Sequence, residues 1–347
     1  MASPLRPGGL SGHPLTSRDI RITHQILRIF PAKDFRTAQF VVEYRISSNR
    51  SGRQIPMLFY ALHLRDSFKV SLDGRPVSLW VDPRSAQPEF LLDKYSGADD
   101  SEEITIRWRE DVQRTFKISD LRYFEMDLEE GPHELRVEYV SDVWENVSDP
   151  VKRYSFHYAL EPARYWASFG TMEVHVETVE LPEGISSNLG APHATPAPGH
   201  LVWYFNHLPA DSFELSWEPQ VSSLARWVMR ISPAGMAGAG GCLLAILHFL
   251  GMIAYRKKTP HHWFSPVAFW GVLIIPFLVL ILYVLAYFFQ DVVIGAHASR
   301  HHGYPYLALL MYPIFVLLYA IPTGIWDFFF RKKFLTRTYS EKFKKES

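Results

Sequence analysis

Three long apolar segments near the end of the chain constrain its fold more than any other feature. They cover residues 234–255, 264–290 and 304–330. About 20 mostly apolar residues cross the hydrocarbon core of a bilayer as a helix, because a helix satisfies its own backbone groups where water is absent. The sequence therefore predicts a three-helix transmembrane region over residues 234–330, in contact with the lipid bilayer.

The average composition hides this division of the chain. Apolar residues make up 48% of the 347 residues, and the mean hydropathy of -0.05 is that of an ordinary soluble protein. Nearly all of the long apolar runs nevertheless lie in the last third. The 36 Lys and Arg residues balance 36 Asp and Glu residues, so no global charge favours a nucleic acid, and we expect no nucleic-acid partner.

Loop charge predicts the orientation of the helices, because short cytoplasmic loops carry an excess of Lys and Arg. The first loop contains Arg256, Lys257 and Lys258, and residues 331–347 hold seven Lys or Arg against two Glu. The second loop, residues 291–303, has one Arg and one Asp. We therefore expect the first loop and a basic tail over residues 331–347 in the cytoplasm, and the N-terminal region outside it.

The start of the chain conflicts with an exported N-terminal region. Residues 1–18 predict a disordered lead rich in Pro, Gly and Ser, and they lack the apolar run of about 7 to 15 residues that a signal peptide needs. Either the start is processed, truncated or assigned too late, or the domain is cytoplasmic and the helices are inverted. Inversion would place all ten basic loop and tail residues outside, so we favour export.

The N-terminal region has the pattern of antiparallel β-structure. Short β-branched and aromatic runs alternate with polar turns, and Asp73-Gly74 is a strong hairpin signal. The pattern predicts a mainly β region of one large or two small antiparallel β-sandwiches, followed by the three helices. A break at residues 141–152 separates a β-sandwich domain over 19–141 from a second sandwich, or a continuation of the first, over 152–220.

The second half of this region contributes many aromatic residues and one long loop. Tyr154, Phe156 and Tyr158 alternate along one strand, which predicts a set that faces the core in preference to a sugar- or peptide-binding platform. Residues 184–200 are rich in Pro, Gly and Ala without periodicity. A loop of this length is either functional or disordered.

None of the strong catalytic signatures occurs in the sequence. It has no phosphate-binding loop, dinucleotide fingerprint, Gly-x-Ser-x-Gly elbow or His-Glu-x-x-His motif. We therefore expect no catalytic residue, cofactor or metal site, and the first hypothesis is a non-enzymatic binding or assembly module within a larger membrane complex. The alternative is an enzyme or transport-complex component with a site in the second half, built from residues such as His157, Glu161 and His175.

Small residues crowd the first predicted helix. Gly235, Gly238 and Gly241 allow another helix to approach closely, and a polar His248 near the middle of the span is expected to face a partner helix. We expect this face to pack on the second or third span or on a protein partner, and the exported domain is the other candidate partner surface. The sequence shows no charged pair at depth, so we expect no transport pathway within the three helices.

Localisation signals leave two alternatives. The single cysteine, Cys242, lies inside the first span, and an exported region without disulfides favours a bacterial cytoplasmic membrane. Lys344-Lys345 has the form of a dilysine retrieval signal, and Asn49 and Asn146 begin formal glycosylation sequons. The endoplasmic-reticulum membrane is therefore the alternative.

Overall fold

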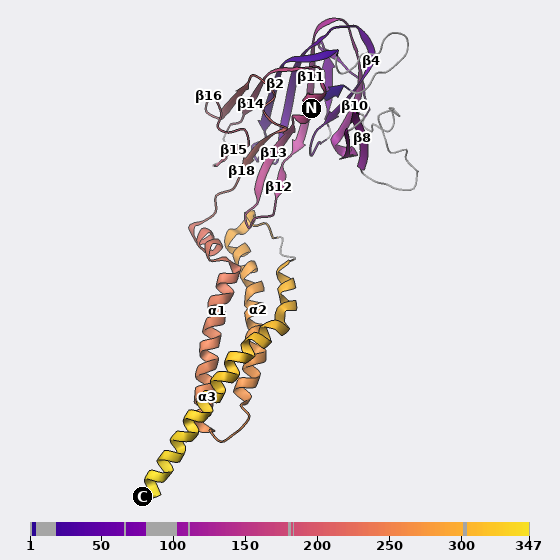
Figure 1. Ribbon diagram of the computed structural model, residues 1–347. Coiled ribbons are helices and arrows are strands. Elements are labelled where there is room, and N and C mark those ends of the chain that lie inside the picture. Colours follow the sequence, from indigo (N-terminus) through magenta and orange to yellow (C-terminus); the bar gives the residue numbers. More distant parts are fainter. Residues whose placement is uncertain are drawn as a thin grey trace. The chain divides into compact units, whose positions relative to one another are not determined.

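The computed structural model describes residues 2–4, 19–65, 67–80, 103–109, 112–179, 182, 184–300 and 304–346. The chain divides into two units, which we describe separately (Figure 1). The β unit comprises Met1–Asn146 and Arg153–Pro219, and the helical unit comprises Val147–Lys152 and Gln220–Ser347. The prediction of N-terminal, mostly antiparallel sheets followed by three long apolar helices is confirmed.

Within the described residues, the β unit contains one eight-stranded sheet, two four-stranded sheets and a two-stranded hairpin. The strands of the eight-stranded sheet follow the order β16 (Ala194–Ala197), β17 (His200–Phe205), β14 (Phe169–Glu177), β2 (Ile20–Pro31), β3 (Thr37–Ser48), β11 (Gly131–Asp142), β5 (Lys69–Leu72) and β6 (Arg75–Pro76). Among the described pairings, only that of β14 with β2 is parallel. Strands from both sides of residues 141–152 thus share one sheet.

The smaller sheets are formed by shorter strands. One has the order β1 (Ala2–Pro4), β4 (Gly52–Tyr60), β10 (Leu121–Leu128) and β7 (Leu79–Trp80). The other has the order β12 (Trp144–Asn146), β13 (Arg153–Ala159), β18 (Ser212–Trp217) and β15 (Ser186–Ser187). The hairpin is β8 (Glu103–Arg109) with β9 (Val112–Lys117), and short 3-10 turns are η2 (Ile118–Asp120) and η3 (Glu161–Tyr165).

One hydrophobic core is shared by the eight-stranded sheet and both four-stranded sheets. It joins Leu27 and Phe40 of the large sheet to Phe59 of β4 and to Phe156 and Tyr158 of β13. The last two side chains are each 1% exposed, so the aromatic residues of β13 face the core as predicted. The burial of this apolar area is the main term that stabilises the sheets against unfolding.

Strand β14 shows how the core and the outward face of the large sheet are separated. Met172, Val174 and Val176 are 0% exposed and belong to the core. Successive side chains of a strand point to opposite faces. The residues between them, Glu173 and His175, therefore lie on the outward face of the sheet.

The helical unit contains three candidate membrane spans, judged by length and composition. The helices are α1 (Ser223–Lys258), α2 (Pro266–Ile294) and α3 (Tyr312–Glu346), with 3-10 segments η4 (Gly295–His297) and η5 (Tyr304–Met311) before α3. Large apolar side chains are exposed on all three helices, among them Leu247, Phe277 and Leu317. An apolar surface of this kind suits contact with lipid.

A break near the start of α1 agrees with the predicted beginning of the first span. Ser232 has φ 64 and ψ 157, outside the helical region, and Pro233 follows it. The Ser232 hydroxyl accepts a hydrogen bond from the Gly235 N–H at 3.2 Å, as an N-cap does for the free N–H groups of a new helix. Proline is favoured directly after such a cap because it has no N–H to satisfy.

A buried charged pair joins α1 to α3, so the expectation that the spans hold no such pair is wrong. Arg256 is 0% exposed. Its Nε donates to Asp327 Oδ1 at 2.8 Å, its Nη2 donates to the other carboxylate oxygen, and its Nη1 donates to the His262 carbonyl at 2.6 Å. The sequence interpretation placed Arg256 in a loop, but α1 continues to Lys258 and packs this side chain against α3.

A second polar contact joins the same two helices about two turns away. The Tyr319 hydroxyl donates to His248 Nδ1 at 2.8 Å, and His248 Nε2 donates to the Val267 carbonyl of α2 at 3.0 Å. Both polar contacts link residues 71 apart in the chain. This constant offset means that α1 and α3 run parallel over this stretch. Gly271 leaves the space for His248, because a Cβ there would lie 1.9 Å from His248 Nε2.

Replacing Asp327 tests how much the charged pair stabilises the helical unit. Asp327→Asn leaves the buried Arg256 guanidinium without a counter-charge, so we expect a loss of about 3–5 kcal/mol in the free energy of unfolding. Thermal unfolding of the full chain in detergent measures the change. The double variant Arg256→Met/Asp327→Leu removes both charges and should recover most of the loss, and a single variant as stable as the original chain would contradict this role of the pair.

Candidate functional site

Six polar side chains gather on the outward face of the eight-stranded sheet, and we call them the polar row. Strand β14 runs through the middle of the set, and β2 and β17 flank it. The members are His24 on β2, Thr171, Glu173, His175 and Glu177 on β14, and His200 on β17.

Strand register brings these side chains together. In the antiparallel pairing of β14 with β17, Glu177 lies directly opposite His200. In the parallel pairing of β14 with β2, Thr171 lies opposite His24. Residues two apart on a strand share a face, so His175 lies beside the Glu177–His200 pair.

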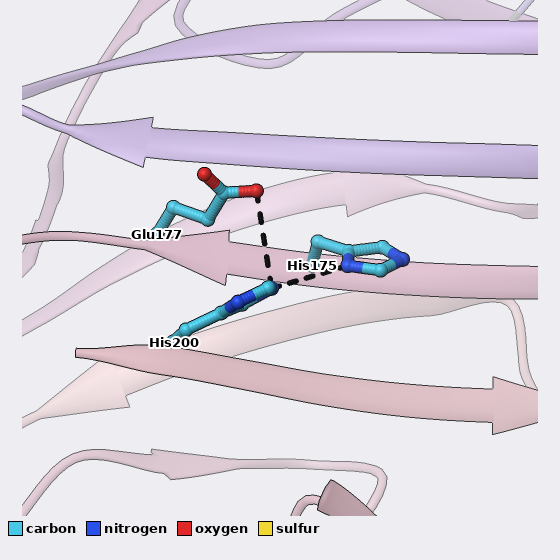
Figure 2. Close-up of side chains that lie close together, drawn as sticks. All are labelled: His175, Glu177 and His200. Carbon is cyan, nitrogen blue, oxygen red and sulfur yellow. Dashed lines mark hydrogen bonds and ion pairs between the residues drawn. The ribbon is translucent and has the colours of Figure 1, made fainter. Parts of the chain in front are cut away.

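Hydrogen bonds and ion pairs run along the polar row. His175 Nδ1 lies 3.2 Å from His200 Nε2, and His200 Nε2 lies 3.8 Å from Glu177 Oε1, as the dashed lines of Figure 2 show. On the other side, His175 Nε2 lies 3.0 Å from Glu173 Oε2. The row continues to His24, whose Nε2 lies 3.9 Å from Glu173 Oε1.

One set of tautomers satisfies these contacts when both central histidines carry a single proton. An ionised carboxylate only accepts hydrogen bonds, so His175 Nε2 carries the proton that Glu173 accepts. The neutral His175 ring then offers a lone pair at Nδ1, which accepts a hydrogen bond from His200 Nε2. The ligand atoms of His175, Glu177 and His200 all lie within 4.8 Å of one another, which makes them a group able to hold a metal ion.

The turn before β17 sets the position of His200. Gly199 has φ +77, and a Cβ there would lie 2.0 Å from the Thr178 carbonyl oxygen. The Thr178 N–H donates to the Gly199 carbonyl at 3.0 Å. Only glycine fits this close approach without displacing the backbone, so it fixes the start of β17 beside the end of β14.

The outward face next to the polar row is an ion-pair network. Arg28 on β2 donates to Glu43 of β3 at 2.7 Å. Arg136 on β11 donates to the other oxygen of Glu43 at 2.7 Å and to Glu138 at 2.7 Å. Arg28 and Arg136 are therefore paired with Glu43 and Glu138.

The residues of the alternative, enzymatic hypothesis do not form one site. His175 belongs to the polar row, whereas His157 lies on β13, where its Nε2 is 2.7 Å from Ser155 Oγ, and Glu161 begins η3. Burial lowers the pKa of His157, which favours the neutral ring. The Ser155 side chain is 1% exposed, which leaves a substrate no access to its hydroxyl.

The glycines singled out on the first helix have different surroundings. A Cβ on Gly241 would lie 2.9 Å from Val279 Cγ2 of α2, whereas a Cβ on Gly238 would meet no atom within 4 Å. A Cβ on Gly235 would meet only neighbouring side chains of α1, at 3.2 Å or more. His248 contacts both other helices, as described above.

The two glycosylation candidates lie in the β unit. Asn49 is exposed in the turn between β3 and β4, and Asn146 is half-buried at the end of β12.

Sequence reasoning named His175 but missed Glu173, Glu177 and His200 beside it. Glu173, His175 and Glu177 alternate with valines in the segment Glu-Val-His-Val-Glu, a strand pattern that places all three titratable side chains on one face. That signal was available in the sequence. The pairing with His200 was not, because it depends on the register between β14 and β17.

Comparisons with known proteins show only a distant likeness of fold. No protein-family model matches the chain, and no curated protein matches it. A Legionella pneumophila protein, described provisionally as nutrient binding, has a TM-score of 0.37 at 11% identity, over 62% of this chain and 70% of that one.

Two enzyme structures give lower scores. Native leukotriene A4 hydrolase of yeast has a TM-score of 0.34 at 8% identity, over 57% of this chain and 29% of that one. An M1 zinc metallopeptidase of Deinococcus radiodurans has a TM-score of 0.30 at 13% identity, over 58% and 43% of the two chains. This chain thus spans less than half of either enzyme, and similarity at this level carries no inference about what it binds.

Replacing Gly199 tests how the turn positions His200. Gly199→Ala places a Cβ against the Thr178 carbonyl, so we expect faster hydrogen exchange of the backbone amides of β14 and β17. Gly190→Ala, between β15 and β16, is the matched control, because Gly190 also has positive φ, at +89, but has no atom within 4 Å of the added Cβ. We expect the control to lower the free energy of unfolding by only about 1–2 kcal/mol, the cost of placing alanine in a left-handed backbone conformation. Equal exchange in both variants would contradict the account.

Proposed function

We propose that this protein is a membrane-anchored binding module whose β unit lies outside the cytoplasm and binds through the polar row. The row itself is the observation that supports the proposal. Glu173, His175 and His200 are joined by hydrogen bonds on a face that the core does not need for its packing. Titratable side chains gathered on a rigid sheet form a surface that is pre-organised to bind a ligand.

The loop charges support this orientation. Lys257 and Lys258 lie at the end of α1, and the end of α3 continues the basic sequence from Arg331. Arg256 no longer counts toward the excess, because Asp327 neutralises it. The remaining excess still favours a cytoplasmic first loop and C-terminus. We place the protein in a bacterial cytoplasmic membrane, with the endoplasmic-reticulum membrane as the alternative.

An enzyme or transport-complex component is the second candidate. One observation favours it: the polar row lies mainly in the second half of the β unit, where that hypothesis places its site. The two candidates differ in what the row does to its ligand. A binding module holds the ligand and releases it unchanged, whereas an enzyme releases a product. Mass spectrometry of a bound ligand before and after release separates them.

Cysteine accessibility tests the orientation. In a Cys242→Ala background, we expect Asn49→Cys to react with a membrane-impermeant thiol reagent in intact cells whose outer barrier is open. Lys345→Cys should react only after the membrane is permeabilised, because the basic tail remains inside. The reverse pattern would place the β unit in the cytoplasm and contradict the proposal.

We also propose that the open glycine face of α1, Gly235 and Gly238, packs on a helix of a partner subunit. Gly238→Leu should weaken co-purification of the partner, because a large side chain prevents close approach of a second helix. Gly241→Leu is the contrasting variant and should destabilise the α1–α2 contact inside the chain, where Val279 lies close. Unchanged co-purification with Gly238→Leu would leave only packing within the chain.

A further inference from the structure

We propose that His175, Glu177 and His200 bind one divalent transition-metal ion of the zinc class. This inference deepens the proposed function and rests on it, because it names the ligand of the polar row. The three residues come from two adjacent strands, His175 and Glu177 from β14 and His200 from β17 (Figure 2).

The distances suit such an ion. In tetrahedral coordination with metal–nitrogen distances of about 2.0–2.1 Å, two ligand atoms lie roughly 3.3–3.5 Å apart. His175 Nδ1 and His200 Nε2 are 3.2 Å apart, and His200 Nε2 and Glu177 Oε1 are 3.8 Å apart. All three ligand atoms lie within 4.8 Å of one another, so rotation of the side chains is the movement required to bring them to bonding distance of one ion.

The protonation states suit the ion as well. Glu173 accepts the proton of His175 Nε2 at 3.0 Å, which leaves Nδ1 as the free lone pair. A carboxylate behind a metal-bound histidine is the usual arrangement, because it fixes the tautomer and raises the basicity of the ligand. His200 must move its proton from Nε2 to Nδ1 on binding. This change of tautomer alters neither its charge nor the proton count.

The ligand types select the class of metal. Two imidazoles and one carboxylate suit zinc and the neighbouring divalent transition metals, whereas calcium and magnesium prefer oxygen ligands alone. Thiolate is not part of the set, since Cys242 lies in α1. The side chains are 17% exposed for His175, 27% for His200 and 41% for Glu177, so solvent reaches the site and can complete the coordination.

The surrounding charges do not oppose a cation. Arg28 lies opposite His175 in the register of β2 with β14. Its guanidinium, however, is bound to Glu43 at 2.7 Å. The carboxylates of Glu173 and Glu177 have histidines as their described ion-pair partners, so a bound dication supplies the fixed positive charge that this pair of acids lacks.

A zinc titration of the full chain in detergent tests the proposal. The chain is purified without a polyhistidine tag and stripped with a chelator, and zinc binding is followed by calorimetry. We expect one site of micromolar or tighter affinity. We expect each of the variants His175→Gln, Glu177→Gln and His200→Gln to weaken the zinc affinity by more than about 100-fold. Loss of a residue that only supports a ligand weakens metal affinity by about 10–100-fold, so a larger effect indicates a direct ligand. Glu177→Gln is the variant least able to disturb the fold, because at 41% this side chain is the most exposed of the three.

Two further variants separate the site from other histidines. Glu173→Gln should weaken zinc about 10–100-fold, because Glu173 supports His175 without binding the ion. His193→Gln is the matched control, since His193 Nδ1 accepts from the Tyr204 N–H outside the cluster, and it should leave the affinity unchanged. A chain that binds no zinc, or one that binds it equally well in all three ligand variants, would overturn the proposal.

The titration also stands apart from the test of orientation. Zinc binding is measured on purified protein, so it does not depend on which side of the membrane the β unit occupies. If the chain does not bind zinc but Asn49→Cys reacts in intact cells, the proposed metal site is wrong and the proposed orientation stands. If the chain binds zinc but Lys345→Cys reacts in intact cells and Asn49→Cys does not, the proposed metal site stands and the proposed orientation is wrong.

Discussion

The pleat of strand β14 sets its valines in the hydrophobic core and its titratable side chains on the opposite face. Val174 and Val176 are 0% exposed in the core, and the pleat turns His175 and Glu177 to the other face. A slip of one residue would bury the titratable side chains and expose the valines, at a cost of several kcal/mol. The hydrophobic core therefore also fixes the geometry of the polar row.

In the helical unit, the lipid environment restricts where polar side chains can lie. Lipid offers no hydrogen bonds, so a polar side chain among the helices needs a partner from the protein. Arg256 forms an ion pair with Asp327, and His248 forms hydrogen bonds with Tyr319 and the Val267 carbonyl. These contacts connect α1 to both other helices, while much of the apolar surface of α3 is left exposed.

Much of the architecture could be predicted from the sequence, because it depends on local patterns. Apolar length gave the three spans, and short alternating runs with the Asp73-Gly74 turn gave the antiparallel strands. Contacts between distant residues could not be predicted in this way. Arg256 and Asp327 lie 71 residues apart in the chain. The residues that surround either one in the sequence therefore do not indicate which residue it pairs with.

The candidate site shows the same limit. The alternation from Glu173 to Glu177 was visible in the sequence, but His200 closes a loop whose composition showed only Pro, Gly and Ala without period. Its position opposite Glu177 follows from strand register and from the close approach of Gly199 to Thr178. Neither property has a signature in one sequence.

The most direct test of the central claim is anomalous X-ray scattering from crystals of the zinc-loaded full chain. We expect a zinc peak between β14 and β17, about 2.0–2.1 Å from His175 Nδ1 and His200 Nε2. We also expect Glu177 Oε1 to lie within bonding distance of the same peak. Zinc found only at other histidines, or no peak at the polar row, would contradict the account.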